Sequence, residues 1–316
     1  MAARTVSDEA SVAALQARLR KNLRRLAPWA AREEVSSFRV YDRDIPEVPL
    51  TIDRYGTAAG VHLHVSVFEP RHGIAEAAVQ RWAGEAAAAL AVDRARVHVK
   101  RRARGVEHVR VGEEGARLEV AEGGLRFLVN LTDYVDTGLF LDHRRTRARV
   151  RREAGGKRFL NLFSYTGSFT VYAAAGGAHS SCSLDLSATY CRWAHDNLRQ
   201  NGLASAAHVI DRVDALAWLE QPAGAPAFEL AVLDPPTVST SKRASRALDV
   251  QADHPWLIAR TLDRLVPGGV LYFSTNLLRF TLGAVAATSV VEVTGETMSP
   301  DFSRRPPIHR CWRIVK

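Results

Sequence analysis

Three aspartates in the C-terminal half of the chain could supply the acceptors of a nucleoside-binding site. Asp185, Asp214 and Asp234 follow the second, third and fourth of a series of short apolar segments. A carboxylate at the carboxyl end of a buried strand can accept hydrogen bonds from ribose hydroxyls. Each aspartate alone could equally cap a helix. Three of them after successive segments instead indicate one shared ligand with hydroxyl and amino groups.

The last of these acids opens the stretch Asp234-Pro235-Pro236-Thr237, which we predict to be the catalytic loop. The apolar run before it, residues 228–233, is typical of a strand buried on both faces of a parallel sheet. Proline has no backbone N–H to donate, so the two prolines should end the strand at its carboxyl edge. Asp234 and Thr237 should then lie at the mouth of a ligand site.

The stretch Ser164-Tyr165-Thr166-Gly167-Ser168 follows the first apolar segment and contains a single glycine. Loops that hold a dinucleotide pyrophosphate usually have the three glycines of G-x-G-x-x-G. A nicotinamide cofactor is therefore disfavoured, and a nucleoside with an amino-acid tail and no phosphate fits better. Together with the three aspartates, the loop predicts an S-adenosylmethionine site of the class I methyltransferase type.

Alternating strand-like and helix-like segments after Asp133 position these residues and predict a doubly wound parallel sheet. A helix should begin after the N-cap Ser187 and end at Asn201-Gly202. Another should run from about residue 253 to 265 and end before Pro267-Gly268-Gly269. The parallel strands are expected at 159–163, 183–186, 208–210, 228–233 and 270–273.

The last two strand-like segments, 290–293 and 310–315, have no helix-length stretch between them. They should therefore pair antiparallel at the sheet edge. The expected fold class is α/β, a Rossmann-like class I methyltransferase fold with a seven-stranded, mostly parallel sheet and an antiparallel edge hairpin. A small N-terminal α+β domain precedes it.

The first 130 residues have another pattern. Four leucines at helical spacing, from Leu15 to Leu26, alternate with arginines and a lysine and predict a basic amphipathic helix. Strands and a long helix follow, and Glu122-Gly123-Gly124 should form the turn of a hairpin. We expect three parts: a basic helix in 1–32, a small α+β domain in 33–130 and the methyltransferase domain in 131–316.

Basic residues point to a polyanionic partner. The formal net charge is +9, and a dense cluster comprises Arg94, Arg96, Lys100, Arg101, Arg102 and Arg104. Such a cluster favours RNA phosphates, although a solvated surface would also tolerate it. Arg101, Arg102 and Arg104 are therefore candidate RNA-binding residues, as are Lys242 and Arg243 beyond the catalytic loop.

Composition excludes several other classes of protein. The chain has 316 residues and three cysteines without a CxxC pair, which argues against a disulfide framework or a zinc site and leads us to expect no metal. No apolar segment reaches the roughly 18 residues of a membrane span, and no signal-like segment opens the chain. We expect a cytoplasmic protein without a membrane partner. The oligomeric state is not predicted.

Several long strings resemble one known family, the RlmK-type module. This module is the C-terminal half of the bifunctional bacterial 23S ribosomal RNA guanine methyltransferases and methylates guanine N7. The resemblance runs from the basic helix to the last strand. The strings that carry it are 130–144 (NLTDYVDTGLFLDHR), 159–168 (FLNLFSYTGS), 234–243 (DPPTVSTSKR), 249–254 (DVQADH) and 308–312 (IHRCW).

The resemblance implies a role for each matching position. The loop after the first strand would contact the methionine part of the cofactor, Asp185 the ribose and Asp214 the adenine. The segment 137–144 would fold over the cofactor, with Phe140 packing on it and Arg144 near its carboxylate. The implied cofactor-binding residues are Phe140, Arg144, Asn161, Phe163, Tyr165, Thr166, Gly167, Asp185, Leu186, Asp214, Ala215 and Asp234.

The expected activity is methylation of guanine N7 in 23S ribosomal RNA or a large-subunit precursor. N7 carries a free lone pair, so no strong general base is needed. Methylation at guanine N2 is an alternative, but amine methyltransferases commonly have an aromatic residue where Thr237 stands. Cytosine C5 chemistry needs a nucleophilic cysteine, and residues 235–254 contain none. A catalytically inert RNA-binding protein is the alternative from another class.

Overall fold

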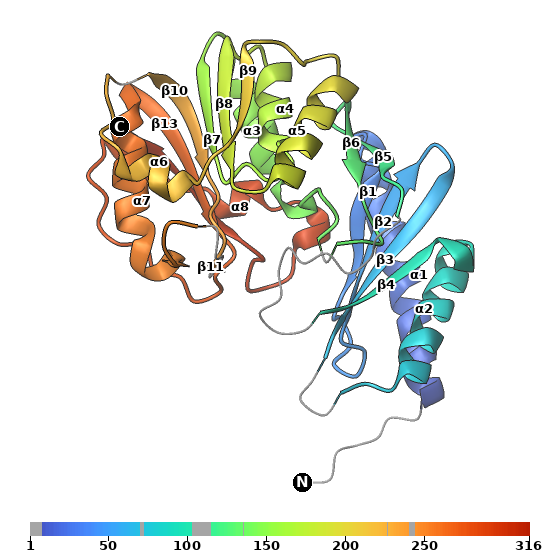
Figure 1. The fold of residues 1–316 in the computed structure, drawn as a ribbon. Coiled ribbons are helices and arrows are strands. Elements are labelled where there is room, and N and C mark those ends of the chain that lie inside the picture. Colours follow the sequence, from blue (N-terminus) through green and yellow to red (C-terminus); the bar gives the residue numbers. More distant parts are fainter. Residues whose placement is uncertain (1–7, 70–72, 103–114, 135, 226, 240–243) are drawn as a thin grey trace. The chain divides into compact units, whose positions relative to one another are not determined.

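The computed structural model describes residues 8–69, 73–102, 115–134, 136–225, 227–239 and 244–316. The chain divides into two compact units, Met1–Leu141 and Asp142–Lys316, and each is described by itself (Figure 1). The elements of the first unit are α1 (Asp8–Arg32), β1 (Ser37–Asp42), β2 (Leu50–Thr57), β3 (Gly60–Phe68), α2 (Glu76–Leu90), a 3₁₀ turn (Arg94–Arg96), β4 (Val97–Arg102), β5 (Leu118–Glu122) and β6 (Leu125–Val129).

The first unit is built on a four-stranded sheet. Its strands lie in the order β1-β2-β3-β4, with β1, β2 and β3 antiparallel and β4 parallel to β3. A parallel pair needs a crossover connection, and α2 supplies it. The predicted hairpin is present as β5 and β6, and its turn is Gly123-Gly124. Both glycines have positive φ, which suits a two-residue hairpin turn.

The helix α1 is amphipathic, as the leucine spacing predicts. Leu15 and Leu19 are fully buried in one hydrophobic cluster with α2 and strands β1, β2 and β3. The opposite face keeps its cations in solvent, and those that are exposed include Arg20, Lys21, Arg24 and Arg25. The basic helix therefore shares its core with the α+β part of the first unit.

The second unit contains the parallel sheet. Its elements are α3 (Arg144–Glu153), β7 (Arg158–Leu162), α4 (Ser168–Ala175), β8 (Ser180–Asp185), α5 (Ala188–Gln200), β9 (His208–Arg212), α6 (Ala215–Glu220), β10 (Phe228–Leu233), β11 (Val238–Ser239), β12 (Leu248–Asp249), α7 (Val250–Arg264), β13 (Leu265–Thr275), β14 (Ser289–Glu292), α8 (Thr294–Thr297), a 3₁₀ turn (Pro300–Phe302) and β15 (Arg310–Val315). A further 3₁₀ turn, Leu141–His143, lies at the boundary between the units.

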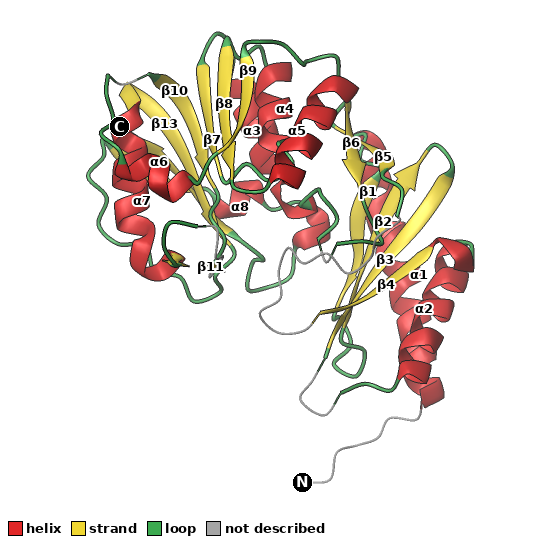
Figure 2. Ribbon diagram, in the orientation of Figure 1, coloured by secondary structure: helices red, strands yellow, loops and turns green. Residues whose placement is uncertain are grey.

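The seven-stranded sheet has the order β14-β15-β13-β10-β7-β8-β9. Strands β7, β8, β9, β10 and β13 are parallel, and β15 is antiparallel to both of its neighbours. This confirms the predicted fold class, including the antiparallel pair at the edge. Helices cover both faces of the sheet, with α3, α4 and α5 on one side and α6 and α7 on the other (Figure 2).

Two hydrophobic clusters fix this layering because alternate residues of each strand enter opposite layers. On β7, Leu160 and Leu162 pack with α6 and α7, whereas Phe159 packs with α3 and α4. On β10, Ala231 and Leu233 enter the first cluster. The strands are therefore buried on both faces, as their unbroken apolar runs predict.

Several element boundaries differ from the sequence-based expectation, most of them by one to three residues, and strand β8 begins at Ser180 and not at residue 183. Strand β13 begins at Leu265, earlier than the predicted residue 270, and includes Pro267-Gly268-Gly269. Its register against β10 shifts between Phe228 and Leu230. Gly268 has φ +76°, a backbone conformation that glycine adopts easily, so the strand continues past the proline through a bulge. Helix α7 begins at Val250, capped by the Asp249 carboxylate.

No helix among the described residues is long and apolar enough to cross a membrane.

The packing of α1 gives a stability prediction. Leu19→Ala should lower the free energy of unfolding by about 2–5 kcal/mol, because it removes a fully buried side chain from the core of the first unit. Leu23, only half-buried on the same helix, is the matched control, and Leu23→Ala should cost less than half as much. Denaturant titration followed by Trp29 fluorescence checks both. Equal losses of unfolding free energy in the two variants would contradict the prediction that the fully buried Leu19 contributes more to the core than the half-buried Leu23.

Candidate cofactor and active site

The order of the parallel strands places a topological switch point between the loops that follow β7 and β10. Strands β7, β8 and β9 follow one another in one direction across the sheet, and β10 and β13 lie on the other side of β7. The loops that leave β7 and β10 therefore turn away from each other at the carboxyl edge. Ligands of such sheets bind at this switch point. Both stretches predicted from the sequence, 163–167 and 234–237, are located there.

The loop after β7 has an unusual backbone. Phe163, Tyr165 and Gly167 have φ values of +57°, +49° and +72°. For a bulky non-glycine residue this conformation costs on the order of 1–3 kcal/mol and tends to occur where a ligand is bound. The loop is held by Ser164 N–H, which donates to the Leu184 carbonyl at 2.9 Å, and by Asn197 Nδ2, which donates to the Thr166 carbonyl at 2.9 Å. A strained backbone is thus fixed by partners on β8 and α5.

Gly167 is required by space as well as by conformation. A Cβ atom at this position would lie 2.7 Å from the Cβ of Ala194 on α5. The first residue of α4 therefore follows a point where two backbones approach closely. This close approach explains why the loop needs one glycine and not three: the glycine serves helix packing, and no pyrophosphate has to be accommodated.

Asp185 joins the loop to the next helix. Its Oδ2 accepts a hydrogen bond from Tyr165 N–H at 2.9 Å, and its Oδ1 accepts one from Ser187 N–H at 2.8 Å. An ionised carboxylate has about four acceptor positions, so such a group can accept from a ligand as well as from backbone N–H groups. The side chain is partly buried and sits beside the start of α5. It is thus able to accept ribose hydroxyls while it orders the loop.

Asp214 has two backbone partners at the end of β9. Its Oδ1 accepts from Leu216 N–H at 3.0 Å and caps α6, and its Oδ2 accepts from Ser245 N–H at 2.5 Å. The helix-cap explanation therefore applies to this acid. The second bond also links the end of β9 to the segment that follows the catalytic loop. Leu186 is half-buried after β8, and Ala215 is buried as the first residue of α6.

Asp234 is held from two sides. Ser274 Oγ on β13 donates to its Oδ1 at 2.5 Å, and the Nε2 atom of His143 lies 3.6 Å from its Oδ2. The side chain keeps 25% exposure, so it can still meet a ligand. Pro235 is buried and Pro236 is half-buried behind it. The Thr237 hydroxyl donates to the Asn276 side chain, which ties the catalytic loop to the residue after β13.

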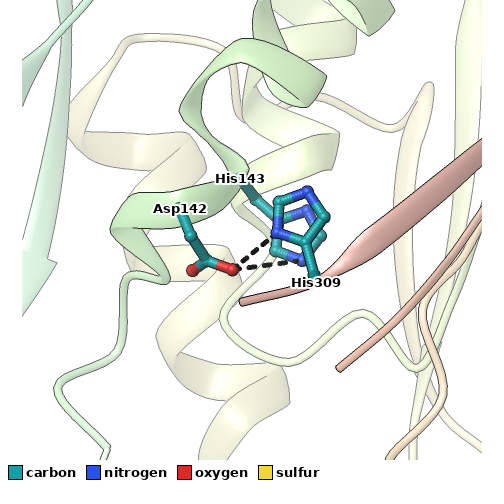
Figure 3. A group of neighbouring side chains, drawn as sticks. All are labelled: Asp142, His143 and His309. Atoms are coloured by element: carbon teal, nitrogen blue, oxygen red, sulfur yellow. Dashed lines mark hydrogen bonds and ion pairs between the residues drawn. The ribbon is translucent and has the colours of Figure 1, made fainter. Parts of the chain in front are cut away.

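Behind Asp234 lies a buried cluster of Asp142, His143 and His309 (Figure 3). His309 Nδ1 is 2.7 Å from Asp142 Oδ2, and the two imidazole rings stack with centroids 4.0 Å apart and planes 9° apart. Such side chains can bind metals, but imidazole lone pairs lie in the ring plane. An ion between two stacked rings would be out of both planes. The arrangement instead fits a hydrogen-bonded cluster.

Burial and the neighbouring His309 lower the pKa of His143 to about 4. The ring is therefore neutral at neutral pH. We assign its proton to Nε2, because that atom faces the carboxylates of Asp142 at 3.9 Å and Asp234 at 3.6 Å, and both are acceptors only. Its Nδ1 has no hydrogen-bond partner among the described residues.

Of three further predicted cofactor-binding residues, Arg144 and Asn161 have partners within the protein, and Phe140 is exposed. Arg144, 5% exposed, contacts Asp301 and Ser299 at 3.3 Å. Asn161, 1% exposed, donates to Thr170 Oγ1 at 2.9 Å, beneath the loop. Phe140 belongs to the first unit and is 37% exposed. Their roles toward the cofactor stay predictions.

The predicted RNA-binding residues are only partly described. Arg101 lies at the end of β4, and its guanidinium pairs with Glu69 and Glu76. For Arg102 the structure gives the backbone in β4 alone. Arg104, Lys242 and Arg243 lie outside the described residues.

Sequence reasoning missed the residues that contact Asp234. Ser274 lies on β13, and Asn276, which contacts the neighbouring Thr237, follows that strand. His143 lies within the string 130–144, and His309 looked like an ordinary core residue. A signal was available, because both histidines directly precede an arginine at the start of an element. Their contact with Asp234 and Asp142 depends on three-dimensional packing.

The site fits the adenosyl cofactor that the sequence predicts. The buried Ser164 Oγ has no hydrogen-bond partner among the described residues, so a polar ligand group could satisfy it. The Asp185 carboxylate can accept from a ligand as well as from backbone N–H groups, and the strained loop lies directly beside it. The rings of Tyr165 and Tyr190 meet edge to face at 4.6 Å and form an aromatic wall.

Comparison with known proteins defines the class. Residues 59–296 match the family described as S-adenosylmethionine-dependent methyltransferase, and the chain belongs to this family. Its cofactor is S-adenosylmethionine.

Two relatives have names that are more specific than the family description. The chain is 48% identical over 307 residues to proteins from Pseudomonas paraeruginosa and Pseudomonas aeruginosa named ribosomal RNA large subunit methyltransferase K/L. The match covers 94% of this chain and 41% of theirs, so the chain spans about two fifths of their length.

Solved structures share the fold. A protein described as a methyltransferase, crystallised with S-adenosylhomocysteine, has a TM-score of 0.77 at 22% identity, covering 96% of this chain and 82% of its own. A protein from Streptococcus mutans described as an S-adenosylmethionine-dependent methyltransferase has a TM-score of 0.74 at 22% identity, with 96% and 81% covered.

The crowding at Gly167 gives a prediction about cofactor affinity. Gly167→Ala should weaken binding of S-adenosylhomocysteine by tenfold or more, about 1.4 kcal/mol, because the new Cβ meets Ala194 and displaces the loop. Gly202→Ala is the matched control, since Gly202 has φ +66° but no atom within 4 Å of the added Cβ. Isothermal titration calorimetry measures both. Equal affinities would show that the close approach does not shape the site.

Asp185 gives a second prediction. Asp185→Asn should weaken S-adenosylhomocysteine binding by about 10- to 100-fold, because one oxygen becomes an amide that cannot accept from the backbone N–H groups or the ribose. Asp211→Asn, an exposed acid on the neighbouring β9, should leave the affinity unchanged. The same calorimetry applies. Wild-type affinity in Asp185→Asn would remove this carboxylate from the cofactor site.

Proposed function

We propose that this chain transfers the methyl group of S-adenosylmethionine to guanine N7 in 23S ribosomal RNA. The proposal rests on the match to ribosomal RNA large subunit methyltransferase K/L over 94% of the chain, and on its resemblance to the RlmK-type module. The observation that carries it is the position of Asp234: the acid opens the loop after β10, at the switch point beside the cofactor loop.

The chemistry places modest demands on the protein. When bound, S-adenosylmethionine supplies a methyl group on a sulfonium, and the electron pair of the broken carbon–sulfur bond stays on sulfur. The lone pair of guanine N7 forms the new bond, so no proton has to leave. Positive charge passes to the purine, where the Asp234 carboxylate can offset it. The main task of the loops is to hold the acceptor in line with the methyl group.

Two other acceptors are less well supported. Cytosine C5 requires a thiolate, yet burial raises the pKa of Cys182 and Cys191 to about 11, and burial also raises the pKa of Cys311. Guanine N2 would favour an aromatic side chain after the two prolines for stacking on the base. Thr237 stands there, and its hydroxyl is bonded to Asn276.

RNA would reach the site as an unpaired or flipped-out guanine, because the major groove of A-form RNA is too narrow to expose N7 to side chains. Among the described cations, the exposed Arg20, Lys21, Arg24 and Arg25 of α1 suit phosphate contacts. Arg101 suits them less well, since it is paired with two glutamates. A large-subunit precursor in the bacterial cytoplasm is the expected substrate.

The test is nucleotide mapping by mass spectrometry. Unmodified 23S ribosomal RNA incubated with the protein and S-adenosylmethionine should gain N7-methylguanosine. Asp234→Asn should lower the single-turnover rate at least tenfold, about 1.4 kcal/mol in the barrier, and change S-adenosylhomocysteine affinity less than threefold. The Asp211→Asn variant should match the wild type in both measurements. A methyl group on N2 or on cytosine C5, or no methylation at all, would contradict the proposal.

A further inference from the structure

The cluster behind Asp234 has no part in the chemistry described so far. Asp142 and His143 precede α3, and His309 precedes β15, so the cluster brings together residues 167 positions apart in the chain. All three are buried, with exposures of 8%, 5% and 1%. Burying a carboxylate and two imidazoles is costly unless they are partnered. Because the cluster lies next to Asp234, a role in supporting that carboxylate would explain why these three residues are buried together.

The contacts within the cluster of Asp142, His143 and His309 hold the His143 ring next to Asp234. His309 is fixed at both ring nitrogens, with Nδ1 on Asp142 at 2.7 Å and Nε2 at 3.3 Å from Thr297 Oγ1. His143 stacks flat on His309 and meets Phe169 edge to face at 5.7 Å. These two neighbours fix the plane of the His143 ring, and its Nε2 lies on the side of Asp234. The protein thus aims a neutral N–H donor at a carboxylate.

We propose that His143 is a positioning residue for Asp234, and that its Nε2–H becomes a hydrogen-bond donor to Oδ2 when the substrates bind. The present separation of 3.6 Å is longer than a hydrogen bond. Such contacts often tighten only in the substrate complex. With Ser274 on Oδ1 and His143 on Oδ2, the carboxylate would be locked in orientation. The proposal rests on the catalytic role of Asp234 proposed above.

In this arrangement, Asp142 and His309 act on Asp234 through His143. The Asp142 carboxylate holds Nδ1–H of His309, and the stacked His309 ring holds the plane of His143. The ionisable groups that face His143 are Asp142, Asp234, His309 and Arg147. Because the His143 ring is neutral, it contributes a dipole and no net charge. The His143 ring therefore adds no positive charge beside the Asp234 carboxylate.

Replacing His143 by glutamine or by asparagine tests whether Asp234 needs a donor at the position of Nε2. In His143→Gln the amide nitrogen reaches about as far as Nε2, whereas in His143→Asn it reaches only as far as Nδ1. We expect His143→Asn to lower the single-turnover methylation rate about tenfold and His143→Gln to stay within about threefold of the wild type. S-adenosylhomocysteine affinity should be unchanged in both. Equal rates in the two variants would overturn the proposal.

Nuclear magnetic resonance tests the contact without RNA, and without any His143 variant that might fail to fold. In the wild type, imidazole ¹⁵N shifts should show His143 as the neutral Nε2–H tautomer between pH 6 and 8, and Asp234→Asn should move the Nε2 signal. An Nδ1–H tautomer or an unmoved signal would refute the proposal. The spectra can show the Nε2–H tautomer and its response to Asp234→Asn even if the wild type methylates no guanine. In that case the proposed function is wrong, and the contact between His143 and Asp234 still holds.

Discussion

The carboxylate of Asp185 is the interaction on which the site depends. One oxygen holds the backbone of the loop after β7, and the other holds the backbone at the start of α5. Together with the bonds from Ser164 to Leu184 and from Asn197 to Thr166, they keep the left-handed residues of this loop in a costly conformation. The same acid that is expected to accept the ribose therefore also builds the loop beside it, so binding and local folding share one group.

The fold was largely predictable because its signals are local. Unbroken apolar runs identified the parallel strands, and the Ser187 cap and Asn201-Gly202 located α5. The short link between 290–293 and 310–315 correctly indicated antiparallel pairing. Strand β13 was predicted too short, since a proline and two glycines usually end a strand. Here a glycine bulge lets the strand continue, an effect that depends on pairing with β10 and not on local propensity.

The site was less predictable because it is made of contacts between distant segments. Residue types after the strands indicated Asp185, Asp214 and Asp234, but not that the first two already accept backbone N–H groups. Arg144 has a buried partner in Asp301, which lies 157 positions away and which no spacing rule could pair with it. The contact between His143 and Asp234 was not predicted for the same reason. Sequence patterns gave the edge of the sheet where the chemistry should occur, and packing decided which side chains meet there.

The place of β15 in the sheet has a consequence for how the protein is made. This strand is the last of the seven in chain order, yet it lies between β13 and β14 and not at the outer edge. His309 directly precedes it and completes the cluster that starts at Asp142. During synthesis from the N-terminus, the parallel strands can pair well before this segment appears. A growing chain therefore has its cofactor loop early but lacks the support behind Asp234 until β15 has been added, so the capacity to bind the cofactor should precede the capacity to react.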